Sequence, residues 1–206
     1  MSTELILPPA RVARWVANFA DRHGTTTLGV AAGALHGTAE DGSTFEAVLP
    51  FAAAYDSAAE VDAFLATLRV PARWGVLLVR KGGFAIARLE GERLVESKVG
   101  QRHVQGRTKA GGQSQQRFAR RRDNQARQAY EAAAGHAARI LTGPLEALVT
   151  GGDHAAVEAV LEDQRLRHLA ERVVPPWFPV PDPRRAVLDA TITDASSVRM
   201  RVVNAG

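Results

Sequence analysis

The sequence predicts an α/β protein, a single domain in which helices flank a mixed β-sheet. Three observations support this class. Apolar runs separated by Lys81-Gly82-Gly83 and by Glu90-Gly91-Glu92 have the spacing of an antiparallel meander. An alanine-rich, proline-free segment from about 114 to 140 then predicts one long helix. Finally, an apolar run at 145–150 enters another helical pattern through two glycines, as a buried strand does.

Before the meander, the pattern predicts two helices and a hairpin. Residues 9–22 repeat apolar side chains at helical spacing, and Gly24 can end this helix; the apolar positions are Val12, Trp15, Val16 and Phe19. The apolar segments on either side of Glu-Asp-Gly-Ser at 40–43 predict a hairpin. A second helix is expected at about 57–69, with Ser57 and Glu60 as a capping box and a buried stripe of Val61, Phe64, Leu65 and Leu68.

After the long helix, local signals predict the remaining elements of a single domain spanning 1–206. Asp153 is expected to cap a helix that follows Gly151-Gly152, and a shorter helix is expected near 164–171. The segment VVPPWFPVPDP at 173–183 has five prolines, which argues against regular structure there. A last helix and a closing strand are expected at 184–193 and 198–203.

Composition excludes several classes of chemistry. The chain has no cysteine, which removes disulfides, thiolate nucleophiles and zinc ribbons, and its six histidines are scattered without a ligand spacing, so no metal site and no cofactor are expected. There is no Gly-Lys-Ser/Thr phosphate loop and no Gly-x-Ser-x-Gly elbow. Because no signal peptide or long apolar run is visible, we expect a cytoplasmic protein without a membrane partner.

Positive charge is concentrated in one part of the chain. Between Lys98 and Arg127 there are nine basic residues and one acidic residue, a net of +8, whereas the whole chain has a net charge of +4. The remainder is therefore mildly acidic, at −4. One basic element on an acidic body is typical of a nucleic-acid contact, although a solvated charged helix has the same composition.

Residues 107–122, RTKAGGQSQQRFARRR, lie at the centre of this basic element. Gly106, Gly111 and Gly112 allow positive φ and a close approach to another molecule. The glutamines follow at the start of the long helix, where free N–H groups and the positive end of the helix dipole favour a phosphate or a developing oxyanion. The residues alone thus predict a mobile tip on a basic helix.

The string GGQSQQRFARRR resembles the catalytic motif of the eukaryotic and archaeal class 1 peptide release factors. That motif is Gly-Gly-Gln, a serine, two variable residues, Arg-Phe-Ala-Arg and a further basic stretch; the matching residues are Gly111, Gly112, Gln113, Ser114, Arg117, Phe118, Ala119, Arg120 and Arg122. The motif covers about 105–130, and the order of elements from about 70 to 203 fits the same domain more loosely. The resemblance implies the fold of the central catalytic domain of those factors, with the Gly-Gly-Gln loop at about 100–113.

A chain of 206 residues leaves no room for codon-reading and GTPase-binding domains as well, so a stand-alone catalytic domain is expected. It is similar to the release-factor-like peptidyl-tRNA hydrolases of ribosome-associated quality control, of the actinobacterial type. The signature glutamine of that family follows a Gly-x-x-Gln spacing, which Gly112 and Gln115 satisfy, whereas Gln113 satisfies Gly-Gly-Gln. The downstream Arg-Phe-Ala-Arg favours Gln113, and Gln115 stays open.

The resemblance implies a hydrolase of peptidyl-tRNA, a carboxylic ester hydrolase that rescues stalled ribosomes or large subunits without codon recognition. Gly111 and Gly112 would shape the loop, and Gln113 or Gln115 would position a water, since a glutamine amide does not titrate. The partners would be large-subunit ribosomal RNA and peptidyl-tRNA, with no DNA expected. The candidates for RNA contact are Arg107, Lys109, Arg117, Arg120, Arg121 and Arg122.

Three other readings remain at this point. Some members of the quality-control family are thought to cleave tRNA near its 3′ end, which would leave a shortened tRNA. A non-catalytic ribosome- or RNA-binding module would need the arginines and not the glutamines. An unrelated α/β protein could also contain the motif by chance. Phe118 is expected to anchor the start of the long helix, and Tyr130, Trp15, Trp74 and Trp177 are expected to pack in the core or at its edge.

Overall fold

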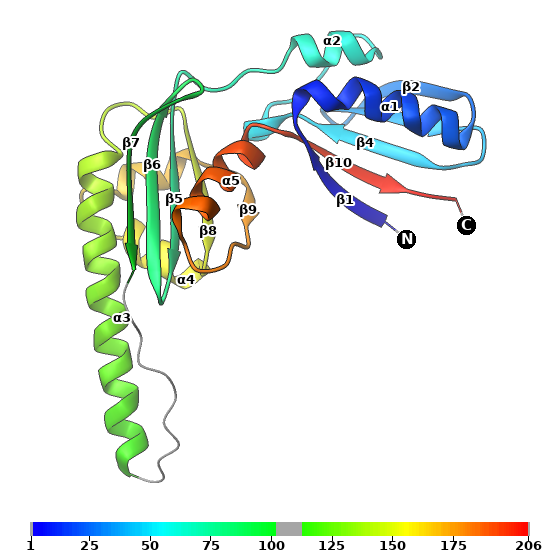
Figure 1. Cartoon of the computed structure of the whole chain (residues 1–206). Helices are drawn as coiled ribbons and strands as arrows, with labels where there is room; N and C mark the ends of the chain where they lie inside the picture. Colours follow the sequence, from blue (N-terminus) through cyan, green and yellow to red (C-terminus); the bar gives the residue numbers. More distant parts are fainter. Residues whose placement is uncertain (1, 102–112, 206) are drawn as a thin grey trace. The chain divides into compact units, whose positions relative to one another are not determined.

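The computed structural model describes the backbone of residues 2–101 and 113–205, and the side chains of 2–101 and 127–205. The chain divides into two compact units (Figure 1). Unit 1 comprises Met1–Val70 and Ile192–Gly206, and unit 2 comprises Pro71–Thr191. Each unit has its own five-stranded sheet. That residues 1–206 form a single catalytic domain stays a prediction. The long helix predicted for that domain lies in unit 2.

Unit 1 is an antiparallel sheet with two helices. The strands lie in the order β1-β10-β4-β3-β2, with bounds Ser2–Leu7, Val198–Val203, Thr44–Val48, Ala34–Ala39 and Thr26–Ala31. The helices α1 (Pro9–His23) and α2 (Val61–Ala66) contact each other, and a short 3-10 turn η1 lies at Pro50–Ala52. Alternate strand residues such as Leu35, Phe45 and Met200 form the core with Val12, Val16 and Phe19 of α1.

The structure confirms the helix at 9–22 and its end at Gly24, where φ is +93°. The hairpin around 40–43 is also confirmed, as β3–β4. A second turn at Ala32-Gly33 adds the hairpin β2–β3, which the sequence pattern did not separate. The capping box of α2 was wrong: the helix begins only after Glu60, and no side chain caps it.

Unit 2 is built on the predicted mixed sheet, in the order β7-β6-β5-β8-β9. The bounds are Arg93–Gln101, Gly83–Glu90, Arg73–Arg80, Ala147–Gly152 and Val173–Phe178. The meander β5-β6-β7 is antiparallel, as expected, while β8 pairs in parallel with both β5 and β9. The helices are α3 (Gln113–Ile140), α4 (His154–Leu161) and α5 (Arg185–Ala195), which continues along the chain into unit 1.

For the segment after α4, the expected short helix is present and the expected irregular connection was wrong. The short helix near 164–171 is a 3-10 helix, η2 (Arg167–Arg172). The proline-rich segment forms a strand, β9, instead of an irregular connection. Because β9 is the last strand of its sheet, it needs hydrogen bonds on one side only. Its two prolines lie where the register against β8 shifts, between the pairs Val149–Val174 and Gly151–Phe178, so the missing N–H groups are tolerated.

Candidate functional site

Helix α3 carries the candidate motif and is unusually long, at 28 residues. At 1.5 Å per residue it extends about 42 Å. No proline interrupts it, Gly135 is its one glycine, and alanine is frequent, so intrinsic propensity favours the helix along its whole length. Figure 1 shows α3 running along the sheet of unit 2 and then continuing past the end of β7.

The C-terminal half of α3 is fixed by a seam of small buried side chains, which we call the buried seam; it comprises Ala129, Ala133, Ala137 and Ile140. Through this half the helix packs on β5, β6, β7 and α4, and its core partners include Leu77 and Ile86. The alanines allow the helix backbone to lie close to the sheet. The N-terminal half, from Gln113, therefore extends from a rigid base.

Polar contacts add to this base. Arg139 of α3 forms an ion pair with Glu96 of β7. Tyr130 is partly buried, and burial first, then the charge of Asp153, raise the pKa of its phenol. His136 stacks obliquely on Phe84, with ring centroids 5.4 Å apart. These contacts hold the described half of α3 on the sheet.

The predicted site residues divide into two groups. Gln113 is the first residue of α3 and Gln115 follows in its first turn. The helix also contains most of the predicted RNA-contacting residues, whose side chains are not described: Arg117, Arg120, Arg121 and Arg122. Gly111, Gly112, Arg107 and Lys109 lie outside the described residues.

Helical geometry separates the two candidate glutamines. At about 100° per residue, Gln113 lies on the face of α3 opposite the buried seam, whereas Gln115 lies in line with the seam. The position of Gln115 is five full turns before that of Ala133. Arginine positions within about 80° of Gln113 around the helix axis are 117, 120 and 121. Gln113 and the positions of Arg117, Arg120 and Arg121 thus lie on the side of α3 that is opposite the buried seam.

The Gly151-Gly152 turn is a structural feature and not an anion site. Gly152 has φ +102°, and a Cβ there would lie 2.2 Å from the Val79 carbonyl oxygen. The N–H of Asp153 donates to that same oxygen at 2.8 Å. The Asp153 side chain does not cap α4 as expected; its Oδ1 lies 3.6 Å from Nε of Arg80. Since a carboxylate already faces that guanidinium, the turn offers no place for a phosphate.

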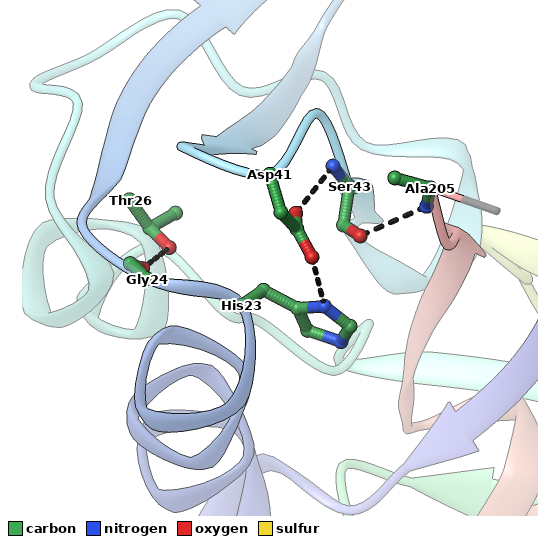
Figure 2. Close-up of polar contacts among 6 residues, drawn as sticks. All are labelled: His23, Gly24, Thr26, Asp41, Ser43 and Ala205. Carbon is green, nitrogen blue, oxygen red and sulfur yellow. Dashed lines mark hydrogen bonds and ion pairs between the residues drawn. The ribbon is translucent and has the colours of Figure 1, made fainter.

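A His-Asp-Ser group in unit 1 has the composition of a catalytic triad but not its order (Figure 2). Nδ1 of His23 lies 2.8 Å from Oδ2 of Asp41, whose Oδ1 accepts the N–H of Ser43 at 2.8 Å. The Ser43 hydroxyl oxygen accepts the N–H of Ala205 at 2.9 Å. Asp41 therefore lies between the other two residues, so His23 is not placed to take a proton from Ser43. The hydrogen bonds from Ser43 and His23 lower the pKa of Asp41.

The tryptophans pack as predicted. Trp74 is fully buried and donates from Nε1 to the Gly91 carbonyl at 2.9 Å. Trp15 stacks on Phe19, and Trp177 stacks on His154 with centroids 3.6 Å apart. In the part of the chain that the structure describes, no three histidines or carboxylates gather as metal ligands, and no helix is long and apolar enough to cross a bilayer.

Comparison with known families places most of the chain in one of them. The family model of the Actinobacteria/chloroflexi VLRF1 release factor matches residues 72–201, well over half of the chain. The chain belongs to this release factor family. The VLRF1 match spans the whole sheet of unit 2 and all of α3, and with them the Gly-Gly-Gln string. It confirms the resemblance to release factors seen in the sequence.

Two curated relatives agree with the VLRF1 match. Peptide chain release factor subunit 1 of Pyrococcus abyssi (strain GE5 / Orsay) is 30% identical over 106 residues, and that of Thermococcus onnurineus (strain NA1) is 30% identical over 113 residues. These alignments cover 49% and 52% of the chain and 26% and 27% of the relatives. The matched part of the chain thus spans about a quarter of the length of each relative.

A crystal structure of the archaeal translation termination factor aRF1 aligns with 94% of the chain and 64% of its own. The sequence identity is 14% and the TM-score is 0.44. This structural similarity is too weak to assign a family, and the chain's membership rests on the VLRF1 match.

Proposed function

We propose that this chain hydrolyses the ester bond of peptidyl-tRNA and releases nascent chains on stalled ribosomes or large subunits, without reading a codon. The observation that carries the proposal is the Gly-Gly-Gln string at the start of α3, within a chain of the VLRF1 release factor family. The partners would be the ribosomal RNA of the large subunit and the peptidyl-tRNA. No bound cofactor is needed for this reaction.

In the proposed reaction a water attacks the carbonyl carbon of the ester that joins the peptide to the 3′-terminal ribose. The carbon–oxygen bond to the ribose breaks, the ribose oxygen receives a proton, and the peptide leaves as a carboxylate. A glutamine cannot accept the water's proton at neutral pH, so its contribution is to orient the water. N–H groups at the start of the helix would stabilise the negative charge that develops on the carbonyl oxygen.

The length and anchoring of α3 support this role. Gln113 lies 16 positions before Ala129, the first described buried residue of the helix, which corresponds to about 24 Å along the axis. A site inside a large RNA enclosure must be reached by a narrow, rigid element, and a single helix is about 10 Å wide. Because the packed half holds the helix direction, the position of the motif relative to unit 2 is predetermined.

The helix faces favour Gln113 over Gln115. Gln113 shares its face with Arg117, Arg120 and Arg121, so one RNA surface can meet the glutamine and the cations together. Gln115 lies on the side of the buried seam. We therefore propose Gln113 as the water-positioning residue and Gln115 as the competing candidate.

The experiment is single-turnover release of labelled peptide from peptidyl-tRNA on purified stalled ribosomes and large subunits, with a sense codon in the decoding site. Gln113→Ala is expected to lower the release rate by about 10²-fold or more, because removing one positioned donor has effects of that size. Gln116→Ala, on the same helix, is the matched control and should release peptide normally. Gln115→Ala tests the competing assignment, and a loss confined to that variant would overturn our choice of glutamine.

Binding and product analysis complete the test. Gln113→Ala should still bind ribosomes, and the tRNA product of the unaltered protein should keep its full 3′ end. A shortened tRNA would show that the chain cleaves RNA and would overturn the proposal of ester hydrolysis. If the unaltered protein binds ribosomes and releases no peptide, the result would support a non-catalytic RNA-binding module instead.

A further inference from the structure

Helix α1 of unit 1 presents a row of cations that the candidate site does not use. Arg11, Arg14 and Arg22, with Asn18 between them, are all exposed. Their spacing of three and four residues places them along one flank of the helix within about 80° of arc. From Arg11 to Arg22 this row is about 16 Å long. We call these four residues the α1 row.

The cations of the α1 row have no partners among the described residues. None of its three guanidinium groups forms an ion pair, whereas many other arginines of the chain do, namely Arg80, Arg88, Arg93, Arg139, Arg165, Arg185 and Arg199. The one carboxylate of α1, Asp21, is not paired with them. General charge excess does not explain the row, because unit 1 has nine acidic and six basic residues.

Helix stability does not explain the row either. The first turn of a helix favours anions, yet α1 has no acidic residue there and has Arg11 in its place. Only Arg22, in the last turn, agrees with the helix dipole. Arg11 is thus placed against the dipole, and no described residue pairs with any of the three arginines, which favours a ligand from outside the chain.

The row is also held rigidly. On the packed side of α1, Val12, Val16 and Phe19 are buried, and Trp15 stacks on Phe19 with centroids 5.5 Å apart. The direction of the helix is therefore fixed by the core of unit 1. Successive members of the α1 row are three or four residues apart, so their Cβ atoms are about 5–6 Å apart.

We propose that the α1 row binds the phosphodiester backbone of RNA, as a second contact surface separate from α3. Guanidinium groups match phosphate oxygens in planar, bidentate pairs, and the Asn18 amide can donate to another oxygen. The row has no aromatic residue to stack on a base, so its binding is independent of sequence. A membrane surface fits less well, because the exposed neighbours on α1 are Ala10, Ala13, Ala17 and Asp21, and none of these is a large apolar side chain that could insert.

This inference goes beyond the proposed function. The α1 row precedes residue 72, so it lies outside the part of the chain that the VLRF1 model matches. Release chemistry at Gln113 and RNA binding at α1 can each fail without the other. Gln113→Ala is expected to bind RNA through α1 unchanged.

The test is fluorescence anisotropy with a short fluorescein-labelled RNA duplex, measured over a series of salt concentrations. The triple variant Arg11→Gln, Arg14→Gln and Arg22→Gln should weaken binding by at least about tenfold in low salt. If each arginine contacts one phosphate, the slope of log K against log salt should lose about 2.7 of its magnitude, taking 0.9 per contact as for duplex DNA. Circular dichroism and Trp15 emission report whether α1 stays folded.

Two controls make the result decisive. A second triple variant, Arg93→Gln, Arg165→Gln and Arg185→Gln, removes the same net charge from exposed arginines that already have carboxylate partners. It should bind RNA as the unaltered protein does. Replacing the α1 arginines by lysine should restore most of the slope, because the charge is kept. An unchanged slope in the α1 variant, or an equal loss in both triple variants, would overturn the proposal.

Discussion

Two glycines of unit 2 should respond to alanine in opposite directions. Gly135 is in the interior of α3, and a Cβ built there meets nothing within 4 Å. Alanine is favoured over glycine in a helix interior by about 0.8–1 kcal/mol. With no clash to offset this gain, Gly135→Ala should raise the free energy of unfolding of unit 2 by about 0.5–1 kcal/mol.

Gly152 is the opposite case. Its φ of +102° strains any other residue, and the new Cβ would lie 2.2 Å from the Val79 carbonyl oxygen. The backbone strain alone costs about 1–3 kcal/mol. Relieving the clash would also disturb the parallel pairing of β5 with β8 and the N–H of Asp153 on that oxygen. Gly152→Ala should therefore destabilise unit 2 by about 3 kcal/mol or more.

Urea unfolding followed by tryptophan fluorescence measures both effects, because Trp74 and Trp177 both lie in unit 2. With a slope of about 1–3 kcal/mol per molar urea, Gly135→Ala should move the midpoint up by a few tenths of a molar. Gly152→Ala should move it down by about 1 M or more. The reasoning would be refuted by a lower midpoint in Gly135→Ala, or by an unchanged one in Gly152→Ala.

Three further predictions follow from individual contacts. Trp74→Phe removes the donor to the Gly91 carbonyl and leaves a void, so it should cost about 2–3 kcal/mol in urea unfolding; a cost near zero would mean that the hydrogen bond contributes nothing. Hydrogen bonds from Arg165 lower the pKa of Asp163 from 3.8 to about 2, so its stabilisation is present above pH 3.8 and is lost as pH falls through 2. In Arg165→Gln, an NMR titration of the Asp163 carboxyl should move back toward 3.8, and an unmoved midpoint would contradict the assignment. About five phosphate contacts on the basic element should contribute about −3.5 to −4.5 to the log–log salt slope for ribosomal RNA, in addition to any share from the α1 row, and Arg120→Gln should reduce the magnitude by about 0.7–0.9; a flat response would exclude an electrostatic RNA contact.

Local patterns predicted the elements that depend on local forces. Helix α1, the meander β5-β6-β7 and helix α3 all follow from periodicity, turn residues and helix propensity, and each is present near its expected bounds. The predictions that failed had the same local basis, but the folded chain did not follow the local pattern at those positions. The capping box at Ser57 was replaced by a later helix start, and the prolines of 175–176 fit a strand because that strand is at the edge of its sheet.

The candidate site shows the same division. The Gly-Gly-Gln string and the arginines were visible in the sequence, and the VLRF1 match covers them. The α1 row was missed, although the helical spacing of Arg11, Arg14 and Arg22 could have revealed it. That no described residue pairs with these three arginines could be learned only from the folded chain.

By itself, the sequence determined most of the helices, the meander and the Gly-Gly-Gln string, because periodicity, propensity and motif spacing act over a few residues. Only the tertiary structure decided that the first strand pairs with the last, Ser2–Leu7 with Val198–Val203, and that β8 lies between β5 and β9. It also decided which half of α3 is packed and which half projects. Such choices depend on contacts between residues far apart in the chain, and no local pattern encodes the partner that will cover an apolar face or complete a sheet.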